Sequence, residues 1–389
     1  MNKKIVFIFS IICSVSMYAQ PKIWNMQSID NAKVLNSEAT KYLIREADKN
    51  LTSNIITVMD KPMTPPSGDK HDYMSMGRYW WPNPATADGL PYIRKDGVVN
   101  SEIDKLDRIP LGKAARSIYT LSLAFYLTND EKYAAKAIEN LSIWFINKDT
   151  KMNPNMNFGQ TIPGRNEGKG RGEGVLDTYS FVEMLDGVEL LKKSKKFSKA
   201  DQEALNTWFC SYLDWMLTSE IGREENNAKN NHGTAFDIQV ARYALFVGKH
   251  DIAEKVIKEF PAKRLFKQIE PNGSQPLELA RTTAFGYSVF NLTHFIDMAI
   301  MARSLNIDLF NATSDDGRNI TKTIEFLVPY LGKPQSEFPY QQIRDWDKVQ
   351  KELCWQLLRV DKYLSKPIYK SIYNKLLPMT GKDNNYLLY

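Results

Sequence analysis

The sequence predicts an all-α fold, an incomplete (α/α) barrel or toroid built from antiparallel helical hairpins with long loops. Two observations favour this class. Apolar residues recur at helical spacing in about a dozen segments, whereas the alternation typical of strands is almost absent. Several of these segments follow one another across short polar links, as antiparallel helix pairs do. No short repeat is visible, so a regular solenoid is disfavoured.

The helices are expected in the following order. The first spans Ser37 to about Met59 and ends at a proline-rich break. A hairpin follows over residues 114–145, then a helix capped by Asp177, then one that Ser198 and Asp201 begin as a capping box. Further helices are expected at 233–248, 252–260, 292–299, 319–331, 345–364 and 367–377.

Residues 1–19 have the organisation of a secretory signal peptide. Lys3 and Lys4 precede an apolar run from Ile5 to Val15, which is too short to span a bilayer, and a small-residue end at Ala19. We therefore expect cleavage near Ala19 and a periplasmic or secreted protein without a membrane anchor. Residues 20–389 are expected to form one helical domain.

The composition restricts the class of partner. Of the 389 residues 43% are hydrophobic, enough for a large core. The formal charge of +6 becomes about +4 without the two signal lysines, which suits an anionic substrate. The basic residues are scattered, so nucleic acid is not expected, and nothing indicates an oligomeric state. Cys210 and Cys354 lie in apolar helical patterns, where either a disulfide or two buried thiols would fit.

Two long loops interrupt the helical pattern. The first, residues 61–97, is rich in aromatic and basic side chains, and its aromatic content argues against disorder. Aromatic faces beside cations suit stacking on sugar rings and pairing with acidic groups, although the tryptophans would equally fill the core beneath the loop. The second, residues 149–176, lacks the Gly-Lys-Ser/Thr of a phosphate loop and follows no strand, so we expect no nucleotide.

The stretch Asn230–Thr234 leads directly into the helix expected at 233–248. Unpaired backbone N–H groups and the positive end of the helix dipole favour an anion at such a position. With the amide of Asn231 and the imidazole of His232 they would make a carboxylate-binding corner. The alternative is that Asn230 or Asn231 is simply an N-cap and His232 a surface residue.

Other kinds of chemistry have little support in the sequence. The four histidines show no zinc-ligand spacing and no cofactor motif occurs, so we expect neither a metal nor a cofactor. The Gly-x-Ser-x-Gly elbow of many hydrolases is absent. A carboxylate pair for glycoside hydrolysis stays open, because such pairs meet only in the fold.

Three motifs in this order resemble the alginate lyase family: Gly68–Tyr73 with Tyr79–Pro82, then Asn230–Thr234, then Arg281-Thr282 with Tyr287–Leu292. The similarity runs from about residue 60 to residue 360, most of the chain. This family belongs to the α/α-toroid polysaccharide lyases. The resemblance implies β-elimination on a uronic-acid polymer, an anionic polysaccharide.

The resemblance also implies roles for four catalytic residues. Asn231 and His232 would neutralise the substrate carboxylate, and Arg281 would support them or lower the pKa of Tyr287. Tyr287 would protonate the departing glycosidic oxygen; the base would be Tyr287 for a proton on the same face and His232 for one on the opposite face. Without the resemblance, Tyr287 would be a packing aromatic and Arg281 a salt-bridge partner. Substrate contacts are expected from Lys70, His71, Tyr73, Arg78, Tyr79, Trp80, Arg171 and Glu278.

The expected function is therefore an exported lyase that cleaves alginate, mannuronate-rich by preference, and leaves 4,5-unsaturated uronate ends. The six-residue spacing from Arg281 to Tyr287 is one shorter than in some alginate lyases, which keeps glucuronan or another polyuronate as an alternative substrate. The sequence also leaves open a uronoside hydrolase on a similar helical barrel and an inactive sugar-binding protein.

Overall fold

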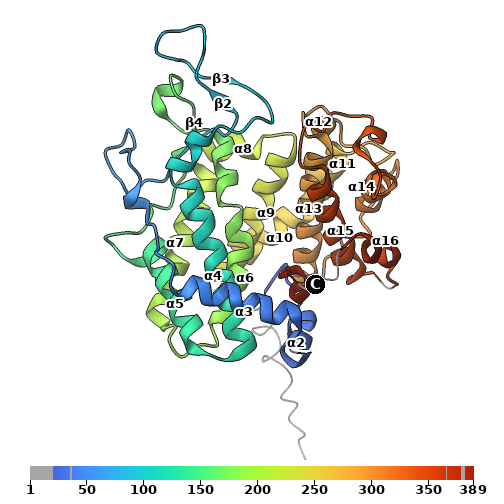
Figure 1. The fold of residues 1–389 in the computed structure, drawn as a ribbon, viewed down its shortest axis with the longest axis horizontal. Coiled ribbons are helices and arrows are strands. Elements are labelled where there is room, and N and C mark those ends of the chain that lie inside the picture. Colours follow the sequence, from blue (N-terminus) through green and yellow to red (C-terminus); the bar gives the residue numbers. More distant parts are fainter. Residues whose placement is uncertain (1–20, 36, 365, 378–381) are drawn as a thin grey trace, which may run out of the picture.

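The computed structural model describes residues 21–35, 37–364, 366–377 and 382–389. The signal peptide and its cleavage site, expected in residues 1–19, therefore lie outside the described residues. Helices dominate the described part of the chain, and they are arranged as an open ring (Figure 1). The all-α prediction and the incomplete (α/α) toroid are thus confirmed. None of the described helices is long and apolar enough to cross a membrane.

Five helices form the inner wall of the ring, each packed on the next. Most of their residues are buried, although α15 keeps Asp347, Lys348 and Lys351 exposed. In order they are α4 (Arg108–Thr128), α6 (Ser180–Leu191), α9 (Asn231–Phe246), α13 (Ala284–Ala302) and α15 (Trp346–Asp361).

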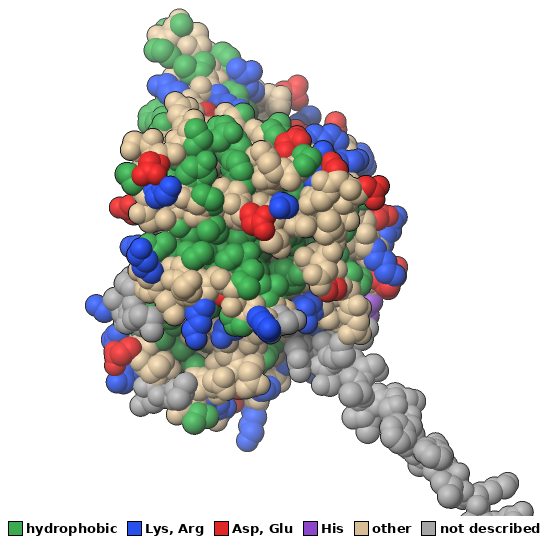
Figure 2. Space-filling model, turned by 90° about the vertical axis from the view of Figure 1, so that its right-hand side faces the viewer, with side chains coloured by type: hydrophobic (Ala, Val, Ile, Leu, Met, Phe, Trp, Pro, Cys, Tyr) green, Lys and Arg blue, Asp and Glu red, His purple; other side chains and the backbone are tan. Residues whose placement is uncertain are grey.

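The outer helices pack against this wall and are buried on one face only. They are α3 (Glu38–Leu51), α5 (Glu131–Leu141), α7 (Lys199–Thr218), α10 (His250–Phe260), α14 (Ile320–Leu327) and α16 (Lys370–Leu376). Seen from the side that carries α14 and α16, apolar side chains lie between basic and acidic ones, with neither sign of charge dominating (Figure 2).

The long loops contain four short strands that the sequence did not predict. Strands β1 (Met74–Met76) and β4 (Phe158–Thr161) pair in parallel, and β2 (Trp80–Trp81) pairs with β3 (Ile93–Arg94) in an antiparallel hairpin. Runs of two to four residues are too short to show a period of two. Because β1 belongs to the first loop and β4 to the second, their pairing gathers both loops at one end of the ring (Figure 1).

Helix boundaries agree with the sequence where a cap is local. Ser37 caps α3 and Ser198 caps α7, as expected, although α3 ends at Leu51 and only a 3-10 turn, Val58–Asp60, follows. The expected capping by Asp177 is wrong. Its carboxylate accepts hydrogen bonds from Tyr73 and Ser75 and pairs with Arg108, long-range contacts that a local pattern does not reveal.

Several short helices were not expected: α2 (Met26–Leu35), α8 (Glu220–Asn226), α11 (Phe266–Gln268), α12 (Pro276–Leu279) and α17 (Asn385–Leu388). Two of them, α8 and α12, supply carboxylates to the candidate active site. Cys210 and Cys354 are both free thiols, so the disulfide alternative is not realised.

Candidate active site

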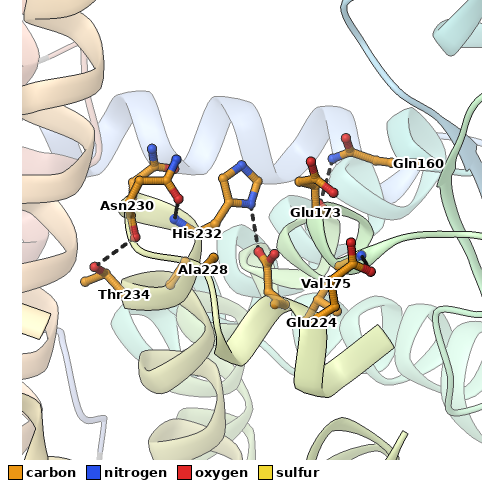
Figure 3. Close-up of polar contacts among 12 residues, drawn as sticks. Gln160, Glu173, Val175, Glu224, Ala228, Asn230, His232 and Thr234 are labelled. Atoms are coloured by element: carbon orange, nitrogen blue, oxygen red, sulfur yellow. Dashed lines mark hydrogen bonds and ion pairs between the residues drawn. The ribbon is translucent and has the colours of Figure 1, made fainter. Parts of the chain in front are cut away.

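The imidazole of His232 lies at the start of α9, next to two acidic side chains. Its Nδ1 is 2.7 Å from Oε1 of Glu225 on α8, and the carboxylate of Glu173 lies beside the ring (Figure 3). Burial disfavours the charged ring, but the carboxylates of Glu225 and Glu173 outweigh it and raise the pKa of His232. The pair with Glu225 leaves Nε2 as the nitrogen available to a ligand.

Asn231 is the first residue of α9 and is fully buried. Its backbone N–H donates to Oε1 of Glu278 at 2.8 Å, and its amide donates to Oε2 at 2.7 Å. The helix N-terminus thus binds a carboxylate, that of Glu278 of this chain, and the expected binding of a substrate carboxylate stays a prediction. Glu278 is 1% exposed and holds Asn231 in place; its contact with the substrate stays a prediction.

The N-cap alternative is realised in Asn230, whose side chain accepts from the N–H of His232 at 3.4 Å. This local role does not exclude chemistry at the next residues, because Asn230 fixes the backbone from which His232 projects.

Tyr287 stands on the first turn of α13, between a guanidinium and a second phenol. Nη2 of Arg281 donates to the Tyr287 hydroxyl at 2.8 Å, and the hydroxyls of Tyr287 and Tyr79 are 2.9 Å apart. Burial and Tyr79 raise the pKa of Tyr287, and the charge of Arg281 offsets this only in part. Arg281 thus lowers the pKa of Tyr287 as expected, but burial and Tyr79 outweigh it, so Tyr287 is a protonated phenol at neutral pH.

The loop that follows β3 reaches across to this pair. Asp96 accepts from Nη2 of Arg281 at 2.7 Å and from Nε at 3.1 Å, and it also accepts from Thr282. Gly97 has a φ of +75°, and a Cβ there would lie 2.4 Å from Oγ1 of Thr282. Only glycine permits so close an approach, so the first loop is fastened to the start of α13.

Further arginines surround the two tyrosines. Arg78 stacks over the Tyr79 ring at 5.3 Å, and its Nε is buried without a hydrogen-bond partner among the described residues. Burial and the nearby charges of Arg108 and Arg344 lower its pKa. A group of cations with one unpaired member, placed beside a phenol, is an arrangement that favours an anionic ligand.

Trp80 and Arg171 occupy the other side of this region. The Trp80 ring lies 5.2 Å from the guanidinium of Arg165 and 5.8 Å from that of Arg171. Arg171 also pairs with Glu173 at 2.5 Å and donates to Gln160, so it positions Glu173 beside His232. Substrate contact by Arg78, Tyr79, Trp80 and Arg171 stays a prediction.

Three residues of the first loop make contacts within the protein: Lys70, His71 and Tyr73. Nζ of Lys70 donates to the carbonyl of Lys61 at 3.1 Å, and Nδ1 of His71 is 2.6 Å from the Lys151 carbonyl, so both stabilise loop contacts. Tyr73 is 0% exposed and donates to Asp177 at 3.0 Å. Tyr73 thus belongs to the core in this structure, and its contact with the substrate stays a prediction.

The sequence did not point to Glu225, Glu173 or Asp96 as site residues. Each carries no motif of its own, and Asp96 is 185 positions from Arg281, its partner. Glu225 precedes His232 by only seven residues, but that signal depends on the unpredicted helix α8. No group of three or more His, Cys, Asp or Glu side chains suited to a metal occurs within the described ranges.

Comparisons with known proteins agree with this geometry. The family model described as alginate lyase matches residues 57–338. The crystal structure of an alginate lyase from Bacteroides ovatus is 51% identical, with a TM-score of 0.93, and covers 94% of this chain and 98% of that one. Alginate lyase A1-III from Sphingomonas species A1 is 14% identical with a TM-score of 0.59, covering 98% and 99% of the two chains, which shows the fold alone. No curated protein matches the sequence.

Proposed function

Because the chain belongs to the alginate lyase family and is a polysaccharide lyase, we propose that it cleaves alginate, mannuronate-rich chains by preference, through β-elimination. The products would carry 4,5-unsaturated uronate ends. We also propose that the protein is exported to the periplasm or beyond, from the signal-like composition of residues 1–19.

One observation carries the proposed chemistry: buried Glu278 connects the two parts of the site, because its carboxylate binds Asn231 and its backbone carbonyl accepts from the N–H of Arg281, which in turn binds Tyr287. Glu278 binds Asn231 directly. Burial raises the pKa of Glu278, and the hydrogen bonds from Asn231 and the nearby charges of Arg281 and His232 offset this only in part. The Asn231–His232 corner and the Arg281–Tyr287 pair therefore belong to a single site.

The reaction assigns a separate task to each group. The C5 proton of a uronate becomes removable once the adjacent carboxylate loses its full charge, and the imidazolium of His232 supplies that neutralisation. The C5 proton passes to the base, which is Tyr287 after proton loss or His232 in its neutral form. The C4–O4 bond breaks, a C4–C5 double bond forms, and Tyr287 gives a proton to the departing O4. Arg281 and Tyr79 hold the Tyr287 hydroxyl in position for this transfer.

The two candidates for the base, Tyr287 and His232, differ in their protonation before the reaction. Tyr287 is protonated at neutral pH, which suits the acid and requires a prior proton loss for any role as base. His232 holds its proton to a higher pH than a free imidazole, which suits charge neutralisation. A pH–rate profile distinguishes these roles, because a cation loses activity with rising pH and a base gains it.

Ultraviolet absorbance of the new carbon–carbon double bond tests the function. Purified protein is mixed in separate assays with polymannuronate, polyguluronate, glucuronan and hyaluronan. We expect the fastest rise in absorbance with polymannuronate. A fastest rise with glucuronan would replace the proposed substrate, and chain shortening without absorbance would identify a hydrolase. Binding without either change would identify an inactive sugar-binding protein.

A further inference from the structure

A polar cavity of about 470 Å³ lies between α3 and α4, and none of the catalytic residues lines it. Its size falls within the range of small-molecule sites, roughly 300–1,000 Å³. Its polar and aromatic lining includes Tyr42, Asn50, Lys113, Arg116, Asn140 and Asn384.

The cavity carries two cations that the protein itself does not neutralise. Lys113 and Arg116 are exposed, one turn apart on α4, and neither forms an ion pair with a described residue. The lining also holds two carboxylates, Glu46, which pairs with Lys49 at 2.6 Å, and Asp383. With Lys382 the lining cations outnumber the carboxylates, so the net charge of the cavity is positive.

The cavity also presents amide groups. Oδ1 of Asn384 is buried and has no hydrogen-bond partner in the described structure. Asn140 is 2% exposed, and its amide donates to Oγ of Ser117 at 3.0 Å. A buried acceptor without a donor costs free energy, and a ligand hydroxyl placed there would remove that cost.

We propose that this cavity binds a short uronic-acid oligosaccharide, at a second site separate from the catalytic one. Lys113 and Arg116 bind its carboxylates, the amides bind its hydroxyls, and the ring of Tyr42 packs on an apolar sugar face. The choice of ligand rests on the proposed function, since fragments of the same polymer occupy both sites. Arg116 lies eight residues along α4 from Arg108, about 12 Å along the helix axis.

The test counts binding sites by calorimetry with a mannuronate trisaccharide on the Tyr287→Phe variant, which suppresses cleavage. We expect two sites, and only one when Lys113→Gln and Arg116→Gln are added. The matched control adds Lys255→Gln and Lys267→Gln, two exposed cations far along the chain from the cavity, and keeps both sites. The cavity substitutions should weaken the second site at least about tenfold, because two charge-assisted contacts are lost.

Two results would overturn the proposal. One is a single binding site in the Tyr287→Phe variant as well as in the variant that adds Lys113→Gln and Arg116→Gln. The other is equal binding of a neutral maltotriose at the second site. Activity separates this inference from the proposed function. In cleavage by the otherwise unchanged enzyme, the cavity substitutions should lower kcat/KM for polymer and leave that for trisaccharide unchanged. Two binding sites without any absorbance change would sink the lyase assignment and leave the second site standing.

Discussion

His232 and Glu225 show how one buried contact decides what a histidine does. A carboxylate at Nδ1 fixes the ring orientation and points Nε2 outward. The same carboxylate raises the pKa of His232, against the effect of burial. An imidazole that would otherwise be about half charged near pH 6.5 therefore stays charged at a higher pH.

The pH dependence of kcat/KM follows from this shift. If His232 acts as the cation, activity is full below its pKa and falls as the pH rises through that raised value. Glu225→Gln removes the carboxylate, lowers the pKa of His232 and moves the fall to lower pH. Glu220→Gln, a change at an exposed carboxylate on the same helix, is the control and should leave the profile in place. Activity that rises through the same range would assign His232 the role of base.

Tyr287→Phe removes one hydroxyl and keeps the ring. Because general acid catalysis contributes roughly 10²- to 10⁴-fold, kcat/KM on polymannuronate should fall by about that factor. Only about 1 kcal/mol of hydrogen bonding is lost, so the unfolding midpoint in urea should hardly change. Tyr79→Phe is the matched control, with a smaller loss expected. The acid assignment fails if the two effects are reversed, since the hydroxyls are 2.9 Å apart.

At the scale of elements, the sequence predicts the helices that have a periodic apolar pattern and a capping residue next to their first turn. Helix α9 begins at Asn231 because apolar residues repeat after it and Asn230 caps it. Strands β2 and β3 have two residues each, which no periodicity can reveal. Asp177 has the sequence position of a cap because it precedes a helix, but a half-buried arginine and two hydroxyls bind its carboxylate instead.

The contact between the loop after β3 and the start of α13 can be tested by substitution. Asp96→Asn weakens the contact that fastens this loop to Arg281 and Thr282. Because small misplacements of catalytic groups are costly, kcat/KM should fall about ten- to a hundred-fold. Asp88→Asn is the control, since Asp88 is exposed and accepts only from the N–H of Leu90, two residues on. Equal rates for both variants would show that the loop contact does not position Arg281.

At the scale of the molecule, the ring explains why the site could be predicted only in part. The sequence motifs pointed to Asn231, His232, Arg281 and Tyr287. In the structure all four lie at one end of the ring. Their partners Glu225, Glu278 and Asp96 come from α8, α12 and a loop. Those partners depend on how distant segments meet, which is a property of packing and not of local sequence.

The opposite end of the ring is held by the first and last described segments of the chain. Asp186 on α6 is fully buried and accepts from the N–H groups of Lys22, Ile23 and Trp24 at 2.7, 2.8 and 2.9 Å. It also pairs with Arg242 on α9 at 3.0 Å. The N–H of Asn25 donates to the Leu388 carbonyl, so the first and last described segments are joined as well.

Asp186→Ala should therefore destabilise the whole ring. It leaves Arg242 as a buried charge without a carboxylate, which costs about 3–5 kcal/mol, and it frees three backbone N–H groups. The free energy of unfolding in urea should fall by at least that amount, and amide exchange at residues 22–24 should accelerate. Asp214→Ala breaks the exposed pair with Lys249 and should cost only about 0–1 kcal/mol. If the two losses are equal, Asp186 does not fasten the N-terminal segment, and the ring must be closed by apolar packing alone.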